Sequence, residues 1–171
     1  MVGLERGETE QYRFPVFISG RFHSGLALAP PNSHLRSVHE MKQRPRIGLT
    51  GELAFQVERQ HAIDFTDGGM PAVLSTPNLI SFLERTSRET LAGSLEVGER
   101  SVGAEIELRH LAPTPVGHTV HCTARVIHVA DREVTFQIEA RDNRELIARG
   151  LHKRAIVVVD RFAQQVREKS A

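Results

Sequence analysis

The sequence predicts an α+β protein in which one long helix lies on a face of an antiparallel sheet. Three observations indicate this fold class. Apolar and polar residues alternate over 52–58, residues 76–91 carry apolar side chains at helical spacing, and a period of two returns in four segments after Gly98. One strand, one helix and a run of four strands is the order typical of such a sheet. The helix is the only predicted element long enough to cover it.

Length and composition predict one domain with an extension before it. The 171 residues are 40% apolar and 25% charged, as in ordinary globular proteins. Residues 1–45 follow neither a period of two nor one of 3.6, so we expect a poorly ordered N-terminal extension there. The domain itself is expected over residues 46–168.

Charge and cysteine content exclude several classes of protein. The 22 basic and 21 acidic residues leave a formal net charge of +1, so we expect neither a nucleic acid nor a membrane as partner. No run of about 18 apolar residues occurs, and the N-terminus lacks the apolar stretch of a signal peptide. Cys122 is the only cysteine, which excludes an internal disulfide and fits a reducing compartment. We therefore expect a cytoplasmic protein.

The first strand and the helix are predicted from local pattern. Leu53, Phe55 and Val57 alternate with polar residues, which is typical of a half-buried strand. Thr76 stands directly before Pro77. We expect the Thr76 hydroxyl to cap the helix and Pro77 to occupy its first position, where a missing N–H costs nothing.

The later strands follow in series. In the first of them Ala104, Ile106 and Leu108 share one face, and His110 continues that face in steps of two. A basic segment at 161–169 is a candidate short helix. The four strands are predicted at 101–110, 118–129, 133–142 and 145–160.

Glu84 interrupts the apolar side of the predicted helix. It shares a helical stripe with Ile80, Ser87 and Leu91, on or beside the face turned to the core. A buried carboxylate needs a partner or a function, because an unpaired buried charge is costly. One explanation is an ion pair with Arg88, four residues on, at a solvated edge. The other is that Glu84 faces a reacting group.

His110 lies on the face of its strand that packs toward the helix, just before a proline-rich turn. A lone inward histidine is often a satisfied core residue. A helix across this sheet would, however, bring Glu84, His110 and Thr76 into one cleft. Carboxylate, imidazole and hydroxyl together are the groups needed for acyl transfer or hydrolysis.

Other polar residues give weaker signals. His118 and His121 beside Cys122 suggest a metal site, but three residues apart in a strand they face opposite sides, so we expect no metal. Arg154 lies within an apolar strand. Either it is an edge residue with its stem along the surface, or it is a fixed positive charge near a thioester or phosphate.

The span 48–166 resembles the hot-dog thioesterases, in the branch of the fluoroacetyl-coenzyme A thioesterases. The spacings from Thr76 to Glu84, to His110 and to Arg154 match that family without gaps. The resemblance rests on the stretches VLSTPNLISFLERT, GERSVGAEIELRHLAPTPVG and ARGLHKRAIV.

The resemblance implies a hot-dog fold, with the sheet wrapped around one long central helix, and a homodimer whose sheets join edge to edge near the active sites. It assigns catalysis to Thr76, Glu84 and His110, and places Gly103 and Arg154 at the acyl site. The substrate would be an acyl-CoA thioester of small or medium acyl chain. No cofactor is expected, since coenzyme A belongs to the substrate.

Two departures from the family concern specificity. Met70 stands where the family has a phenylalanine gate, and the preceding lid segment, 60–69, is shorter. The acyl group is therefore left open. So are the thiol carrier, coenzyme A or acyl carrier protein, and the choice between a dimer and a tetramer.

In the implied chemistry, His110 is the general base and Glu84 either orients it or attacks the carbonyl. Thr76 is either the nucleophile or the group that holds the attacking water. Two alternative functions remain. A hot-dog hydratase or dehydratase uses a carboxylate and a histidine but needs no threonine, and an acyl-CoA-binding protein keeps the pocket without the chemistry.

Overall fold

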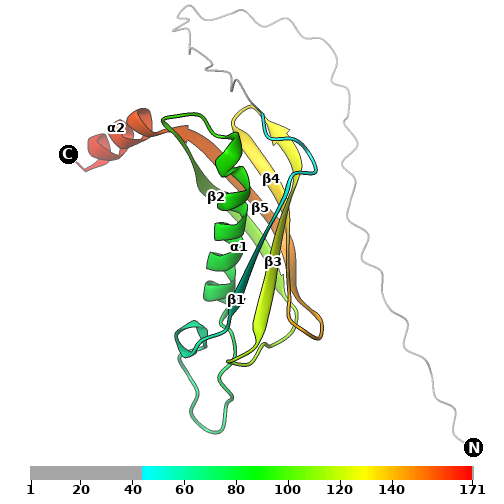
Figure 1. Ribbon diagram of the computed structural model, residues 1–171. Helices are drawn as coiled ribbons and strands as arrows, with labels where there is room; N and C mark the ends of the chain where they lie inside the picture. The colour runs from blue at the N-terminus through cyan, green and yellow to red at the C-terminus, as the bar shows by residue number, and fades with distance from the viewer. Residues whose placement is uncertain (1–43, 171) are drawn as a thin grey trace, which may run out of the picture. The chain divides into compact units, whose positions relative to one another are not determined.

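The computed structural model describes residues 44–170 (Figure 1). The predicted extension, 1–45, therefore lies outside the described residues except for its last two. The elements are β1 (Thr50–Gln56), η1 (Arg59–His61), α1 (Thr76–Leu91), η2 (Ala92–Ser94), β2 (Glu99–His110), β3 (Thr119–Ala130), β4 (Glu133–Arg141), β5 (Leu146–Val158) and α2 (Val159–Lys169).

The five strands form one antiparallel sheet in the order β1-β3-β4-β5-β2. α1 runs along one face of this sheet, and α2 leaves the end of β5 and extends away from it (Figure 1). The sequence predicted this architecture, including the short C-terminal helix. Its element boundaries differ from the observed ones by a few residues.

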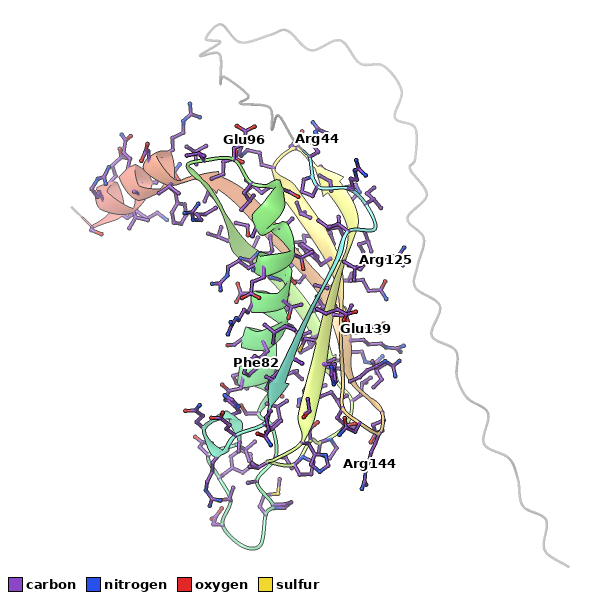
Figure 2. All side chains as sticks on the ribbon, viewed as in Figure 1. Arg44, Phe82, Glu96, Arg125, Glu139 and Arg144 are labelled. Atoms are coloured by element: carbon purple, nitrogen blue, oxygen red, sulfur yellow. The ribbon has the colours of Figure 1, made fainter. Side chains whose placement is uncertain are left out.

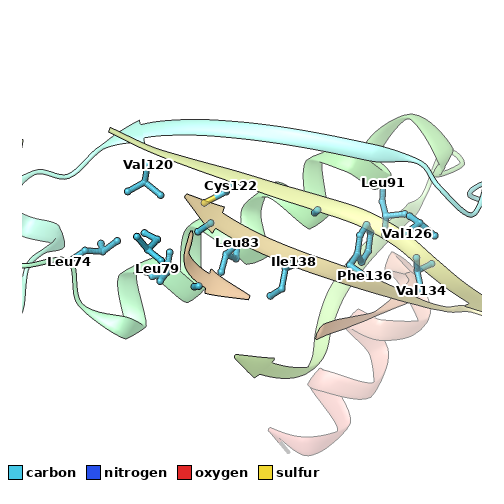
Figure 3. Packing of buried hydrophobic residues seen from close by; sticks show 14 of the residues in the cluster. Leu74, Leu79, Leu83, Leu91, Val120, Cys122, Val126, Val134, Phe136 and Ile138 are labelled. Atoms are coloured by element: carbon cyan, nitrogen blue, oxygen red, sulfur yellow. The ribbon is translucent and has the colours of Figure 1, made fainter. Parts of the chain in front are cut away.

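The core lies between α1 and the sheet. Leu79, Leu83 and Leu91 of α1 are fully buried in one cluster with Phe136 and Ile138 of β4 (Figure 3). These leucines recur at helical spacing, whereas the β4 residues alternate with exposed or half-buried ones, so each element turns one apolar side inward. Burial of each leucine side chain contributes about 2 kcal/mol.

The N-cap of α1 is Ser75, not Thr76 as predicted. Ser75 has extended backbone angles, φ −78° and ψ 148°, and its hydroxyl accepts the backbone N–H of Asn78 at 3.4 Å. The Asn78 side-chain amide donates to the same oxygen at 2.9 Å. Because Ser75 caps the helix, the hydroxyl of Thr76 is left for another partner.

A β-bulge in β2 changes which residues face the helix. The register of β2 against β5 shifts between Gly103 and Glu105, so Ala104 is the extra residue and is exposed. Ala104 therefore does not pack against the core with Ile106 and Leu108, as regular alternation would require. Ile106 and Leu108 pack against the core, and Gly103, before the bulge, faces the same side.

Candidate active site

Thr76 and His110 meet where α1 begins and β2 ends. The Thr76 hydroxyl oxygen, Oγ1, lies 3.0 Å from Nδ1 of His110. Thr76 is exposed, so a substrate can reach this pair. A hydroxyl within hydrogen-bond distance of an imidazole is the arrangement by which a base activates a nucleophile or orients a water molecule.

The surroundings of His110 favour its neutral form. Burial lowers the pKa of His110 below its usual 6.5, and the backbone carbonyl of Ala112 opposes this effect. Its second nitrogen, Nε2, is buried and has no hydrogen-bond partner among residues 44–170. A neutral imidazole near physiological pH has a lone pair ready to take a proton, as a general base requires.

Glu84 pairs with Arg154. Nη1 of Arg154 lies 3.3 Å from Glu84 Oε1 and also 3.3 Å from the Glu84 carbonyl oxygen. The predicted alternative, an ion pair with Arg88, is not what the structure shows, since Arg88 contacts Glu89 instead. The Glu84 side chain is 44% exposed, so one side of the carboxylate is paired and the other is open.

Arg154 is held in place on several sides. Its side chain is 3% exposed, because β5 lies inside the sheet between β4 and β2. The alternative of an edge residue is therefore wrong. Nε donates to the Ser101 hydroxyl at 3.0 Å, Nη2 to the Ser101 carbonyl at 2.9 Å, and Nη1 to Nε2 of His152 at 3.1 Å. Burial lowers the pKa of Arg154, whereas the Glu84 carboxylate opposes this effect.

Gly103 lies directly against Glu84. A Cβ at this position would collide with Glu84 Oε1 and would stand 3.4 Å from Cε1 of His152. The carboxylate thus occupies the space that any larger residue would need, which explains a glycine in the middle of a strand.

Within one chain these residues form two groups. Thr76 and Glu84 are eight residues apart on α1, a rise of about 12 Å. Gly103 and His110 are seven residues apart on β2, roughly 20 Å along a strand. One group is therefore Thr76 with His110, and the other is Glu84 with Gly103 and Arg154; a single chain does not unite them in one cleft.

His152 is a site residue that the sequence analysis missed. It is almost fully buried beside Arg154, and both side chains point to the helix side of β5. The available signal was the alternation of His152, Arg154 and Ile156, which puts two polar residues on an apolar face.

The opposite side of α1 carries an aromatic cluster. Phe82, which Figure 2 labels on α1, stacks on Phe55 of β1 with ring centroids 3.5 Å apart. His61 meets both rings edge-on, at 5.9 Å from Phe55 and 5.1 Å from Phe82. Phe82 thus contacts β1, whereas Glu84 lies against Gly103 of β2.

The remaining candidates contribute no catalytic group. In the part of the chain that the structure describes, no three or more histidine, cysteine, aspartate or glutamate side chains gather as metal ligands. Burial raises the pKa of the Cys122 thiol to about 12, so it stays protonated. Met70 lies exposed in the loop before α1, where its N–H donates to the Asp67 carbonyl at 3.1 Å.

Residues 57–160, more than half of the chain, match the family model described as FlK, fluoroacetyl-CoA-specific thioesterase. This chain belongs to that family. The predicted resemblance is confirmed, and Thr76, Glu84, Gly103, His110 and Arg154 all fall within the matched residues.

Individual members of the thioesterase family are similar along most of the described chain. The fluoroacetyl-CoA thioesterase of Streptantibioticus cattleyicolor is 34% identical over 100 residues, which are 58% of this chain and 72% of that protein. A solved structure of the fluoroacetyl-CoA thioesterase FlK is 29% identical, covers 74% of this chain and 98% of its own, and has a TM-score of 0.68.

The fold is the hot-dog fold, as predicted. A hot-dog-like protein from Thermanaerovibrio acidaminovorans is 25% identical, covers 73% of this chain and 93% of its own, and has a TM-score of 0.68. No helix within residues 44–170 is long and apolar enough to cross a membrane.

Proposed function

We propose that this fluoroacetyl-CoA-thioesterase family member hydrolyses acyl-CoA thioesters to a free acid and coenzyme A. The observation that carries the proposal is the contact between Thr76 and His110 at 3.0 Å, in a chain of a thioesterase family. Coenzyme A is part of the substrate, and the reaction needs no further cofactor. The free, buried Cys122 fits a reducing compartment, and we place the enzyme in the cytoplasm.

The active unit is a homodimer formed along β2. Within residues 44–170, β2 pairs with β5 on one side and is the last strand of the sheet on the other. A twelve-residue edge strand is a template for pairing with a second chain. Two copies of β2 related by a two-fold axis join two sheets into one.

A two-fold axis at Glu107 unites the two groups of site residues. In an antiparallel pair about this axis, Ile106 lies opposite Leu108 of the second copy, and both face the helix side. Because Ala104 is the extra residue of the bulge, the next inward pair is Gly103 opposite His110 of the second copy. Thr76 and His110 of one copy then approach Glu84 of the other, which completes the site.

In the completed site, neutral His110 takes the proton from the Thr76 hydroxyl or from a water molecule that this hydroxyl holds. The Glu84 carboxylate of the second copy, held by Arg154 of that copy, orients the imidazole or the water. The positive end of the α1 dipole lies beside Thr76 and stabilises negative charge on the thioester oxygen. The deprotonated oxygen bonds to the thioester carbon, the C–S bond breaks, and the leaving thiolate of coenzyme A takes the proton from His110. If that oxygen belongs to Thr76, a water molecule deprotonated by His110 then attacks the acyl-threonine, and the free acid leaves as the Thr76 oxygen takes the proton back.

A hydratase is the second candidate that the sequence leaves open. It would use Glu84 and His110 without a threonine. The direct contact of Thr76 with His110 gives the hydroxyl a role in proton transfer, which favours hydrolysis. We expect a small or medium acyl group, with Met70 of the loop before α1 in place of the family's gate.

Thiol release from a panel of acyl-CoAs tests the proposal. The panel includes fluoroacetyl, acetyl, medium-chain and aromatic acyl groups, with each acyl group also loaded on acyl carrier protein. We expect turnover of at least one acyl-CoA, and a loss of about a hundredfold or more in kcat for His110→Ala. Binding of acyl-CoA without thiol release by the wild type would contradict the proposal and favour an acyl-CoA-binding protein.

A further inference from the structure

His152 lies at the centre of a buried chain of hydrogen bonds. The residue is 2% exposed, Nδ1 lies 2.9 Å from the carbonyl oxygen of Glu105, and Nε2 lies 3.1 Å from Nη1 of Arg154. The same Nη1 contacts Glu84 Oε1. His152 is therefore shielded from solvent, and it contacts the arginine that pairs with Glu84.

The two partners determine the proton position on His152. A carbonyl oxygen only accepts hydrogen bonds, so Nδ1 carries the proton that it donates to Glu105. A guanidinium only donates, so Nε2 presents its lone pair to Arg154. His152 is therefore neutral, as the Nδ1–H tautomer.

We propose that neutral His152 is a positioning residue that fixes Arg154 and thereby aims the Glu84 carboxylate at the reacting group. This inference rests on the proposed function, because it assigns a role within the same site. Arg154 needs this support because its Nη1 contact with Glu84 is long, 3.3 Å, and a carboxylate that is 44% exposed has room to turn.

Protonation of His152 breaks its hydrogen bond with Arg154. It converts Nε2 from an acceptor into a donor, and it places a second positive charge against the guanidinium.

The charged groups near the ring are Arg154 on β5 and Glu84 on α1, and Arg88 on α1 acts on Arg154. Its strand neighbours on β2 and β4, Ile106 and Phe136, are apolar. Burial lowers the pKa of His152, and Arg154 lowers it further, whereas Glu84 and the Glu105 carbonyl oppose this.

Two substitutions separate the two hydrogen bonds of the ring. In His152→Gln the side-chain oxygen takes the place of Nε2 and still accepts from Arg154, but it cannot be protonated. In His152→Asn the amide takes the place of Nδ1 and still donates to Glu105, but nothing accepts from Arg154. Both variants remove an imidazole from the core, so each is the packing control of the other.

We expect His152→Asn to lower kcat by about ten- to a hundredfold with little change in KM, since it misplaces a catalytic group. His152→Gln is expected to retain most of the kcat. In the wild type the acid limb of log(kcat/KM) against pH approaches a slope of two, from His110 and His152. In His152→Gln this slope falls to one.

A second measurement needs no turnover. In ¹⁵N NMR of the unliganded protein, we expect the Nδ1–H tautomer at His152, and slowly exchanging side-chain N–H signals from Arg154 in the wild type and His152→Gln. These Arg154 signals should be lost in His152→Asn. If no acyl-CoA is hydrolysed, the proposed function fails, and these signals still decide whether His152 fixes Arg154.

The inference is overturned if His152→Asn and His152→Gln have equal kcat and equal acid slopes in an active enzyme. It is also overturned if the Arg154 signals are the same in both variants, or if His152 is found as the Nε2–H tautomer. His152 would then be a core residue that packs beside Arg154 without orienting it.

Discussion

The Thr76 hydroxyl lies 3.0 Å from Nδ1 of His110, although 34 residues separate the two in sequence. The contact depends on the residue before Thr76. Because Ser75 provides the capping oxygen for α1, the neighbouring hydroxyl is not used by the helix and turns to the end of β2. The start of the helix thus supplies both its own cap and a reactive group.

Substitution of Thr76 tests the role of this hydroxyl. Thr76→Ser keeps an oxygen at the same place, so we expect kcat/KM to fall by less than about tenfold, whereas Thr76→Val should lose about a hundredfold or more. Steady-state thiol release measures both. Equal activity of the serine and valine variants would show that the hydroxyl takes no part in the chemistry, as in a hydratase.

Gly103→Ala tests the close approach of Glu84 to β2. The added Cβ collides with Oε1 of Glu84, so we expect the carboxylate to turn away and kcat to fall by about a hundredfold. Gly93→Ala is the matched control, because a Cβ there meets nothing within 4 Å and the backbone angle is not positive. If Gly103→Ala matches the control in kcat and melting temperature, Glu84 does not need this space.

Arg154→Lys tests whether a charge alone is enough. Lysine keeps the charge but cannot donate to Ser101, His152 and Glu84 at once, because these contacts use three separate guanidinium nitrogens. We expect a lower kcat together with a loss of about 1–3 kcal/mol in the free energy of unfolding, measured by denaturant titration. Wild-type values for both quantities would mean that a single ammonium charge satisfies the site.

Stability is expected to fall at acid pH because of the half-buried His110 and the buried His152. Burial lowers the pKa of His110 and of His152 in the folded protein below the usual 6.5. At pH values between these lowered pKa values and 6.5, the unfolded chain binds more protons than the folded protein. The contribution of the two histidines to the free energy of unfolding is therefore complete above pH 6.5 and is lost as the pH falls. Melting temperatures from pH 7.5 to 5 measure this. The decrease should be shallower in His152→Gln, and an unchanged decrease would assign it to other groups.

The sequence predicted the fold because each element has a clear hydrophobic period. Leu79, Leu83 and Leu91 define the buried side of α1, and the strand alternation defines the sheet. It also placed Glu84 beside the core side. The helix, the strands and the position of Glu84 were predicted from residues close together in the sequence. The folded chain keeps these short-range patterns.

Three features of the site could not be predicted from such short-range patterns. The bulge at Ala104 looks like regular alternation in the sequence, and only the register against β5 reveals it. For Arg154 the alternative of an edge residue stayed open, because the order of strands in a sheet cannot be read from the individual strands. Glu84 is separated from His110 because Thr76 contacts His110 and Glu84 lies eight residues further along α1, a rise of about 12 Å.

Hybrid dimers test most directly the claim that each active site combines Thr76 and His110 of one chain with Glu84 of the other. Glu84→Gln and His110→Ala chains are co-expressed with different affinity tags, and the doubly tagged dimer is purified. We predict about half of the wild-type kcat, because one of its two sites is intact. The control dimer, with both substitutions in one chain and none in the other, should be inactive. The reverse result, an inactive hybrid and a half-active control, would contradict the account and place the whole site within a single chain.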